Sequence, residues 1–160
     1  PFLLELRNVP FRQQEQVAFY LQDHLPRFTG GAFDARGNGQ YLAEVAMQRY
    51  GASRIAQVML SESWYREHMP PVKAALEDGT LDGLPRDADT LADLRAVQVI
   101  RGVPRLPDVR SVGADNGKRH GDSAVAIALA YYASRELNHG PVGARSRRRR
   151  GKPSQGSRWL

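Results

Sequence analysis

The 160-residue sequence predicts an α/β domain followed by a basic tail. Three observations lead to this prediction. Short apolar, β-prone stretches alternate with longer stretches of helical periodicity, which is typical of layered α/β proteins. The composition, 41% hydrophobic and 25% charged, is ordinary for a globular protein with a core. Basic residues gather after residue 139. We therefore expect a folded body at residues 1–138 and a tail at 139–160.

In the first half of the chain, helix-ending and helix-starting residues separate the elements. Pro10 suits the first turn of a helix, and Pro26 ends it. Gly51 is a C-cap residue for the second helix. The elements expected here are a strand at 2–6, a helix from Pro10 to Leu25, a strand at 30–34, a helix at 40–50 and a strand at 54–60.

The second half continues the alternation. Acidic residues in the first turn favour a helix at 86–97, and an alanine-rich stretch with one apolar face favours a helix at 122–137. The other expected elements are helical turns at 61–79 interrupted at Pro70 and Pro71, a short strand and turn at 80–85, a strand at 97–108 with a turn or bulge at Gly102, and a loop at 111–121.

The composition excludes several classes of protein. With no cysteine, the chain has no disulfide, no thiolate metal site and no cysteine nucleophile, and it suits a reducing cytosol. No apolar run approaches the ~20 residues of a membrane helix. The N-terminus lacks a Met and the basic start of a signal peptide, and it begins within an apolar run. We therefore expect a cytoplasmic fragment or excised domain that has no membrane contact.

The net charge of +6 comes from the tail, since residues 140–160 hold seven basic residues and no acid. Such a segment has no apolar periodicity, so we expect it to be disordered. It can bind nucleic acid through phosphate charge, and the residues expected to do so are Arg147, Arg148, Arg149 and Arg150. The alternative is a solvated tail with no specific role.

Asp34 ends a predicted strand, just before the turn Gly37-Asn38-Gly39. A carboxylate at the carboxyl end of a strand lies where open α/β sheets build their sites. The alternative is a turn residue or helix N-cap. A dinucleotide-binding turn is not indicated, because Leu42 stands where the third glycine would be, and no Gly-Lys-Ser/Thr occurs.

Asp122 begins the alanine-rich helix, directly after a loop that holds Lys118, Arg119 and His120. It could be a simple N-cap. The polar density of the loop instead favours a site. Hydrolysis of phosphodiesters with two metal ions requires several converging carboxylates, and oxygen ligands suit Mg²⁺. Asp34 and Asp122 could supply part of such a cluster.

Weaker candidates remain. Glu62 follows a strand and could add an acid, although a helix N-terminal acid is the simpler interpretation. Asp115 is an alternative ligand to Asp122. Ser123 lacks the nucleophile elbow of a hydrolase triad. The aromatic residues around Trp64 and His68 favour packing over base stacking.

Two stretches, "GAFDARGNGQYLAEVAMQRYG" and "RHGDSAVAIALAYY", resemble the nuclease domain of phage large terminase subunits, most closely those of Mu-like phages and prophages. The resemblance covers nearly all of residues 1–137. It implies an RNase H-like mixed sheet flanked by helices. It also implies a metal-dependent endonuclease that cuts concatemeric double-stranded DNA during packaging, with the portal or the small terminase subunit as partners.

By this resemblance, Asp34 and Asp122 are catalytic ligands of Mg²⁺ or Mn²⁺, His120 contacts a phosphate, and Lys118 and Arg119 contribute to DNA binding. The family has a further catalytic Asp on a first strand, which would precede residue 1, so we expect a domain incomplete at its N-terminus. Two alternatives stay open: a non-catalytic remnant that binds DNA or a packaging partner, and another RNase H-like nuclease such as a transposase or resolvase.

Overall fold

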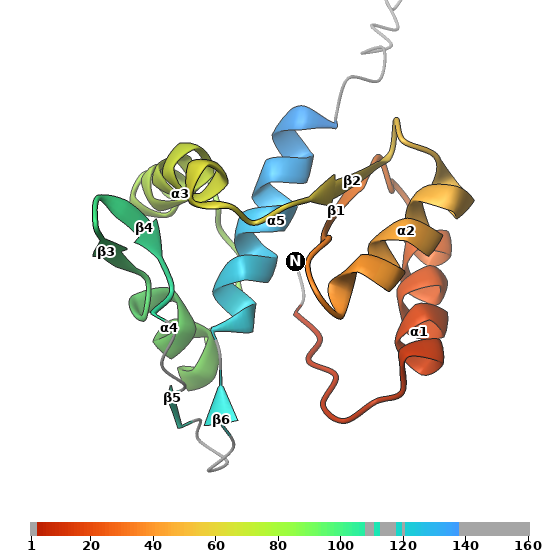
Figure 1. Ribbon diagram of the computed structural model, residues 1–160. Coiled ribbons are helices and arrows are strands. Elements are labelled where there is room, and N and C mark those ends of the chain that lie inside the picture. Colours follow the sequence, from red (N-terminus) through yellow and green to blue (C-terminus); the bar gives the residue numbers. More distant parts are fainter. Residues whose placement is uncertain (1–2, 108–110, 113–117, 120, 138–160) are drawn as a thin grey trace, which may run out of the picture.

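The computed structural model describes residues 3–107, 111–112, 118–119 and 121–137. In Figure 1, α5 runs through the middle, with α1, α2, β1 and β2 on one side and α3, α4 and the β3–β4 hairpin on the other. The elements are α1 Phe11–His24, β1 Gly31–Asp34, α2 Gly39–Tyr50, β2 Ile55–Val58, α3 Glu62–Glu77, α4 Ala88–Arg95, β3 Gln98–Ile100, β4 Val103–Arg105, β5 Ser111–Val112, β6 Lys118–Arg119 and α5 Asp122–Glu136.

The two strands β1 and β2 pair in parallel, with Gly31 opposite Ile55 and Asp34 opposite Val58. Parallel strands require a crossover connection, and α2 supplies it. Ala43 and Ala46 of α2 are fully buried, so this helix packs closely on both strands. The carboxyl ends of the strands therefore meet at one edge, and Asp34 lies at that edge.

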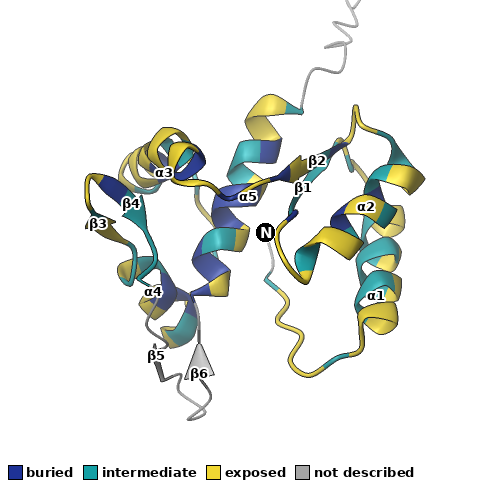
Figure 2. Cartoon of the chain, viewed as in Figure 1, coloured by how far each residue is buried: buried dark blue, intermediate teal, exposed yellow. Residues whose placement is uncertain are grey.

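The main core lies where α5 packs against β1, α3 and α4 (Figure 2). Alanines on the buried face of α5 are small enough to let neighbouring elements approach closely. The buried side chains of this core are Val58, Leu60, Trp64, Tyr65, Met69, Val72, Val103, Ile127, Ala128 and Leu129. Since these residues come from β2 and the residues just after it, α3, β4 and α5, the core joins the two halves of the body.

Across the described residues, the strands form three separate two-stranded sheets: β1–β2 is parallel, and β3–β4 and β5–β6 are antiparallel. The α/β class is confirmed. A single mixed sheet is not what these residues form, and the RNase H-like arrangement remains a proposal. The strand expected at 2–6 is also absent from residues 3–6, where Glu5 accepts a side-chain hydrogen bond from Ser123 instead of a strand ladder forming.

Helix α3 continues through Pro70 and Pro71, so the expected interruption is wrong. A proline inside a helix removes one backbone hydrogen bond. The helix persists because it buries an apolar face, and such packing supplies most helical stability in proteins. The buried residues of that face are Trp64, Tyr65, Met69, Val72 and Ala75.

The stretch at 97–108 is a hairpin whose two-residue turn is formed by Arg101 and Gly102. Both residues have positive φ, 51° and 77°, as a type I′ turn requires. The turn expected at Gly102 is therefore confirmed. By contrast, no strand forms at 80–85, and the expected loop at 111–121 contains β5 and β6.

The tail at 139–160 lies outside the described residues. Within the part of the chain that the structure describes, no helix is both long enough and apolar enough to cross a membrane.

Candidate functional site

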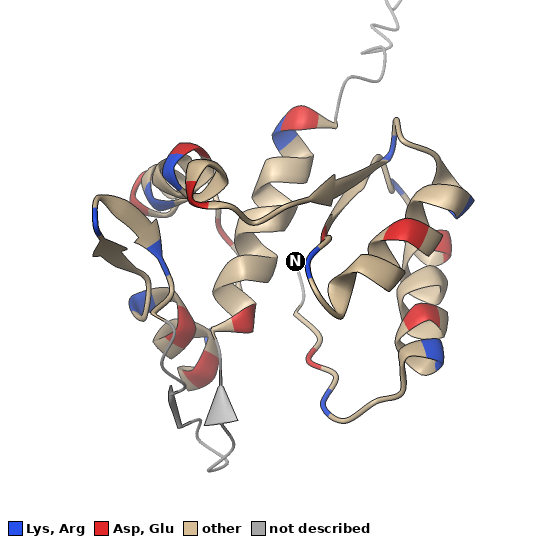
Figure 3. Cartoon of the chain, viewed as in Figure 1, with Lys and Arg blue, Asp and Glu red and all other residues tan. Residues whose placement is uncertain are grey.

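A pocket of about 520 Å³ opens between the end of β1, α3, the end of β4 and the start of α5. Both predicted carboxylates, Asp34 and Asp122, line it. Figure 3 shows acidic positions at the end of β1 and at the start of α5. Leu60 and Leu129 form part of the apolar wall. The fold thus brings together two acids that are far apart in the sequence.

Asp34 is the last residue of β1, and its side chain is 37% exposed. Its Oδ1 accepts a hydrogen bond from the backbone N–H of Arg36 at 3.0 Å, and the Arg36 Nε lies 3.5 Å from the same oxygen. This is the side-chain contact by which aspartate stabilises a turn. Asp34 therefore serves the turn and faces the pocket at the same time.

The glycine at 39 keeps this turn tight. A Cβ at Gly39 would lie closer to the Asp34 carbonyl oxygen than real Cβ atoms ever come. The start of α2 can approach the end of β1 only without a side chain at this position. Packing against Asp34 thus explains Gly39, and the positive φ of Gly37, 51°, explains the first glycine of the turn.

Asp122 is the first helical residue of α5, and the N-cap is Gly121, with φ 75°. The N-cap interpretation of Asp122 is therefore wrong. Its side chain makes no hydrogen bond or ion pair with the residues that the structure describes. A negative charge in the first turn is favourable for the helix dipole. The carboxylate of Asp122 is exposed at the pocket and is available to a ligand.

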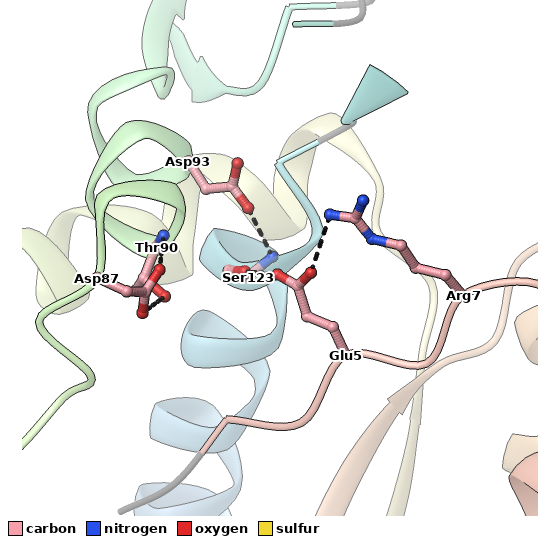
Figure 4. A network of polar contacts seen from close by, with 6 residues as sticks. All are labelled: Glu5, Arg7, Asp87, Thr90, Asp93 and Ser123. Carbon is pink, nitrogen blue, oxygen red and sulfur yellow. Dashed lines mark hydrogen bonds and ion pairs between the residues drawn. The ribbon is translucent and has the colours of Figure 1, made fainter. Parts of the chain in front are cut away.

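A buried acid on α4 holds the start of α5 (Figure 4). Asp93 is only 1% exposed, and its Oδ2 accepts from the backbone N–H of Ser123 at 3.2 Å. The Ser123 hydroxyl donates to Glu5 Oε1 at 3.1 Å, and Arg7 pairs with Glu5 at 3.2 Å. Asp93 thereby satisfies a free N–H of the first turn, as a cap would. This network anchors the first turn of α5, which carries Asp122.

The helix that carries Asp93 is itself capped, as Figure 4 also shows. Asp87 accepts from the backbone N–H and the hydroxyl of Thr90, both at 2.7 Å. These hydrogen bonds from Thr90 lower the pKa of Asp87 below its usual value. Asp93 was not predicted from the sequence, because what singles it out is its contact with Ser123, thirty residues away on another helix.

Three further polar residues that the sequence analysis did not select line the pocket: Arg36, Tyr65 and Arg105. Burial raises the pKa of Tyr65, and the nearby charges of Arg36 and Asp34 also act on that pKa. The Nε of Arg105 is buried and has no hydrogen-bond partner among the described residues. Two acids and two guanidinium groups thus share one pocket.

The weaker candidates from the sequence lie partly within and partly outside the described residues. Glu62 is the first residue of α3 and is 61% exposed, and its Oε1 lies 3.8 Å from Arg105. Its position fits the simpler interpretation, a helix N-terminal acid. The candidates outside the described residues are His120, Asp115, Arg147, Arg148, Arg149 and Arg150. The backbones of Lys118 and Arg119 form β6.

The aromatic residues of α3 pack in the core, as the sequence favoured. Trp64 lies 5.5 Å from Tyr65, 5.0 Å from His68 and 5.9 Å from Tyr132, measured between ring centroids. Trp64 and Tyr65 are buried. This cluster joins α3 to α5.

The side chains at the pocket can be compared with the ligands that a metal ion needs. Carboxylate oxygens are suitable ligands for Mg²⁺ and Mn²⁺. Within the described ranges, no group of three or more His, Asp or Glu residues could hold a metal ion. Asp34 and Asp122 thus fit part of a ligand set, and further ligands would come from outside the described residues.

The chain is similar to two curated proteins. One is the Mu-like prophage FluMu protein gp28 of Haemophilus influenzae, 49% identical over 131 residues, which are 82% of this chain and 25% of that protein. The other is the probable terminase, large subunit gp28, of Escherichia phage Mu, 43% identical over 134 residues, which are 83% of this chain and 24% of that protein. At these identities both are homologues, and the chain spans about a quarter of their length. No protein-family model and no solved structure matches.

Proposed function

We propose that this chain is a segment of a phage terminase large subunit of the Mu-like type, and that its pocket cuts double-stranded DNA. One relative, at 43% identity over most of this chain, is named as a probable terminase large subunit. The observation that carries the nuclease proposal is the meeting of Asp34 and Asp122 in one pocket. Core packing requires neither residue there, since the Asp34 side chain is 37% exposed and Asp122 is an exposed residue.

In the proposed reaction, Asp34 and Asp122 would hold Mg²⁺ or Mn²⁺. Such ions, when bound, lower the pKa of a bound water and stabilise the leaving oxygen of a phosphodiester. The contribution of the protein is to position the two carboxylates. The Asp34 carboxylate is oriented by the Arg36 N–H, and the contacts of Asp93 and Glu5 with Ser123 hold the first turn of α5, which carries Asp122.

The remaining parts of the proposal rest on the resemblance of the sequence to phage large terminase subunits. The domain would have an RNase H-like fold. Its substrate would be concatemeric DNA, and its partners the portal or the small terminase subunit, in the cytoplasm of the bacterial host. The basic residues at 145–150 and at Lys118 and Arg119 would hold DNA by charge.

A second candidate function is a non-catalytic module that binds DNA or a packaging partner. One observation favours it: the contact between Asp34 and Arg36 already gives Asp34 a structural role. In that case the carboxylates would not need to act together.

Nicking of supercoiled plasmid in Mn²⁺ tests the proposal. The parent chain is compared with Asp34→Asn and with Asp122→Asn. Asparagine at 34 keeps an oxygen that can accept from the Arg36 N–H, so the turn is retained while the charge is lost. We expect the parent to nick and both variants to lose the activity.

Asp82→Asn is the matched control, because Asp82 is an exposed acid that does not line the pocket. It should nick at the rate of the parent. Circular dichroism must show that every variant is folded. A folded parent chain that leaves the plasmid intact but still binds DNA would refute the nuclease proposal and support the non-catalytic module.

A further inference from the structure

Arg105 is positioned differently from an ordinary surface arginine. It is the last residue of β4, lines the pocket, and has a side chain that is only 26% exposed. Its Nε is buried without a hydrogen-bond partner among the described residues. Buried polar atoms are normally hydrogen-bonded, so an unpartnered one in a native structure requires an explanation.

The contact with Glu62 does not supply that explanation. The distance from Arg105 Nη1 to Glu62 Oε1 is 3.8 Å, which is too long for a hydrogen bond. The Glu62 carboxylate is largely exposed, so water screens the pair. The guanidinium group of Arg105 therefore keeps donors available at the pocket.

Arg36 supplies a second guanidinium group to the same pocket. Its Nε lies 3.5 Å from Asp34, and its side chain is about half exposed. Arg36, Arg105 and Tyr65 line the same pocket, and the charges of both arginines act on the pKa of the Tyr65 hydroxyl. The pocket thus combines two cations and a hydroxyl with two carboxylates.

We propose that Arg105 and Arg36 bind one phosphate of the DNA backbone in this pocket, with the Tyr65 hydroxyl as a further donor. The inference rests on the proposed function for its ligand, a DNA phosphodiester. Arginine is suited to this ligand because its planar group can donate two parallel hydrogen bonds to phosphate oxygens. Because the Arg105 Nε is buried in this conformation, the side chain would shift slightly to present it to the phosphate. The bound phosphate would lie beside Asp34 and Asp122, where cleavage is proposed.

The test measures DNA binding without cleavage. The full 160-residue chain is titrated with a short fluorescein-labelled duplex in EDTA, and anisotropy gives Kd over a series of salt concentrations. Each lost phosphate contact lowers the slope of log Kd against log salt by about 0.9. Because the two arginines share one phosphate, we expect this full decrease in the double variant Arg36→Gln/Arg105→Gln and part of it in each single variant. The tail arginines add the same slope to every variant, so they cancel in the comparison.

Arg12→Gln is the charge-matched control, because Arg12 is an exposed residue of α1 and does not line the pocket. It should keep the parent slope. Arg105→Lys keeps the charge but not the planar fork, so it should keep the slope and bind more weakly. The inference would be overturned if Arg105→Gln had the same salt slope as the parent chain. It would also be overturned if Arg12→Gln lowered that slope as much as Arg105→Gln does.

The two proposals fail separately. A decreased slope in the pocket variants, in a chain that does not nick plasmid, supports the phosphate site and refutes the nuclease. Nicking that is lost in Asp34→Asn, with no change of slope in the arginine variants, supports the nuclease and refutes the phosphate site. A melting curve for each variant shows whether it is folded as stably as the parent.

Discussion

The substitution Gly121→Ala should destabilise the fold at the point where Asp122 is positioned. Gly121 is buried and has φ 75°, a conformation that an L side chain rarely adopts. A Cβ at this position would also lie 2.5 and 2.6 Å from the two Cδ atoms of Leu106. Both effects disfavour alanine, and Leu106 itself lines the pocket.

The magnitude follows from two terms. The left-handed conformation costs a non-glycine residue about 1–2 kcal/mol. Overpacking a well-packed site costs about 1–3 kcal/mol, and the low end applies because the ends of Leu106 can rotate. We expect the free energy of unfolding to fall by about 2–3 kcal/mol, a large part of the ~5–15 kcal/mol typical of a domain.

Urea unfolding followed by circular dichroism measures this loss. Gly79→Ala is the matched control, because Gly79 also has positive φ, 68°, and has no atom within 4 Å of the position of its Cβ. Gly79→Ala should therefore lose only the stability that the left-handed conformation costs a non-glycine residue. If Gly121→Ala loses no more stability than Gly79→Ala, then Leu106 does not confine this position and the packing argument is wrong.

Two other predictions concern stability. Hydrogen bonds from Tyr50 and Arg49 lower the pKa of Asp23 below 3.8, so its contribution to stability is present above that pH and is lost as the pH falls through the lowered pKa. Asp23→Asn should therefore be less stable than the parent at pH 7, and urea titrations should show the difference shrinking below pH 3.8; a constant difference would contradict the contact. Ile127→Val removes one methylene group from a core side chain that is 5% exposed, so it should lower the free energy of unfolding by about 0.5–1.5 kcal/mol in the same titration at pH 7. An unchanged unfolding midpoint would place Ile127 outside the core.

Local patterns predicted most of the helices and the main strand pair. Pro10 and Pro26 bracket α1, and Gly51, with φ 87°, ends α2 as a C-cap glycine does. Such signals act over a few residues, so they can be recognised without the fold. The exception was α3, where packing of a whole apolar face outweighed two prolines.

The candidate site was predictable only in part. The positions of Asp34 and Asp122, at a strand end and a helix start, marked them in the sequence. Arg105, Tyr65 and Asp93 carried no comparable local signal, because what singles them out is which distant elements they contact. The roles of all these residues in DNA cleavage and binding are predictions for the experiments above.

The sequence by itself determined the α/β class, the order of the helices and the two acids worth testing, because backbone preferences and apolar periodicity are local properties. Only the tertiary structure decided that both acids line one pocket and that Asp93, rather than Asp122, satisfies the first turn of α5. It also decided that two arginines share that pocket. The physical reason is that contacts between α5, β1, α3 and α4 depend on close packing of side chains far apart in the chain, which no local pattern encodes.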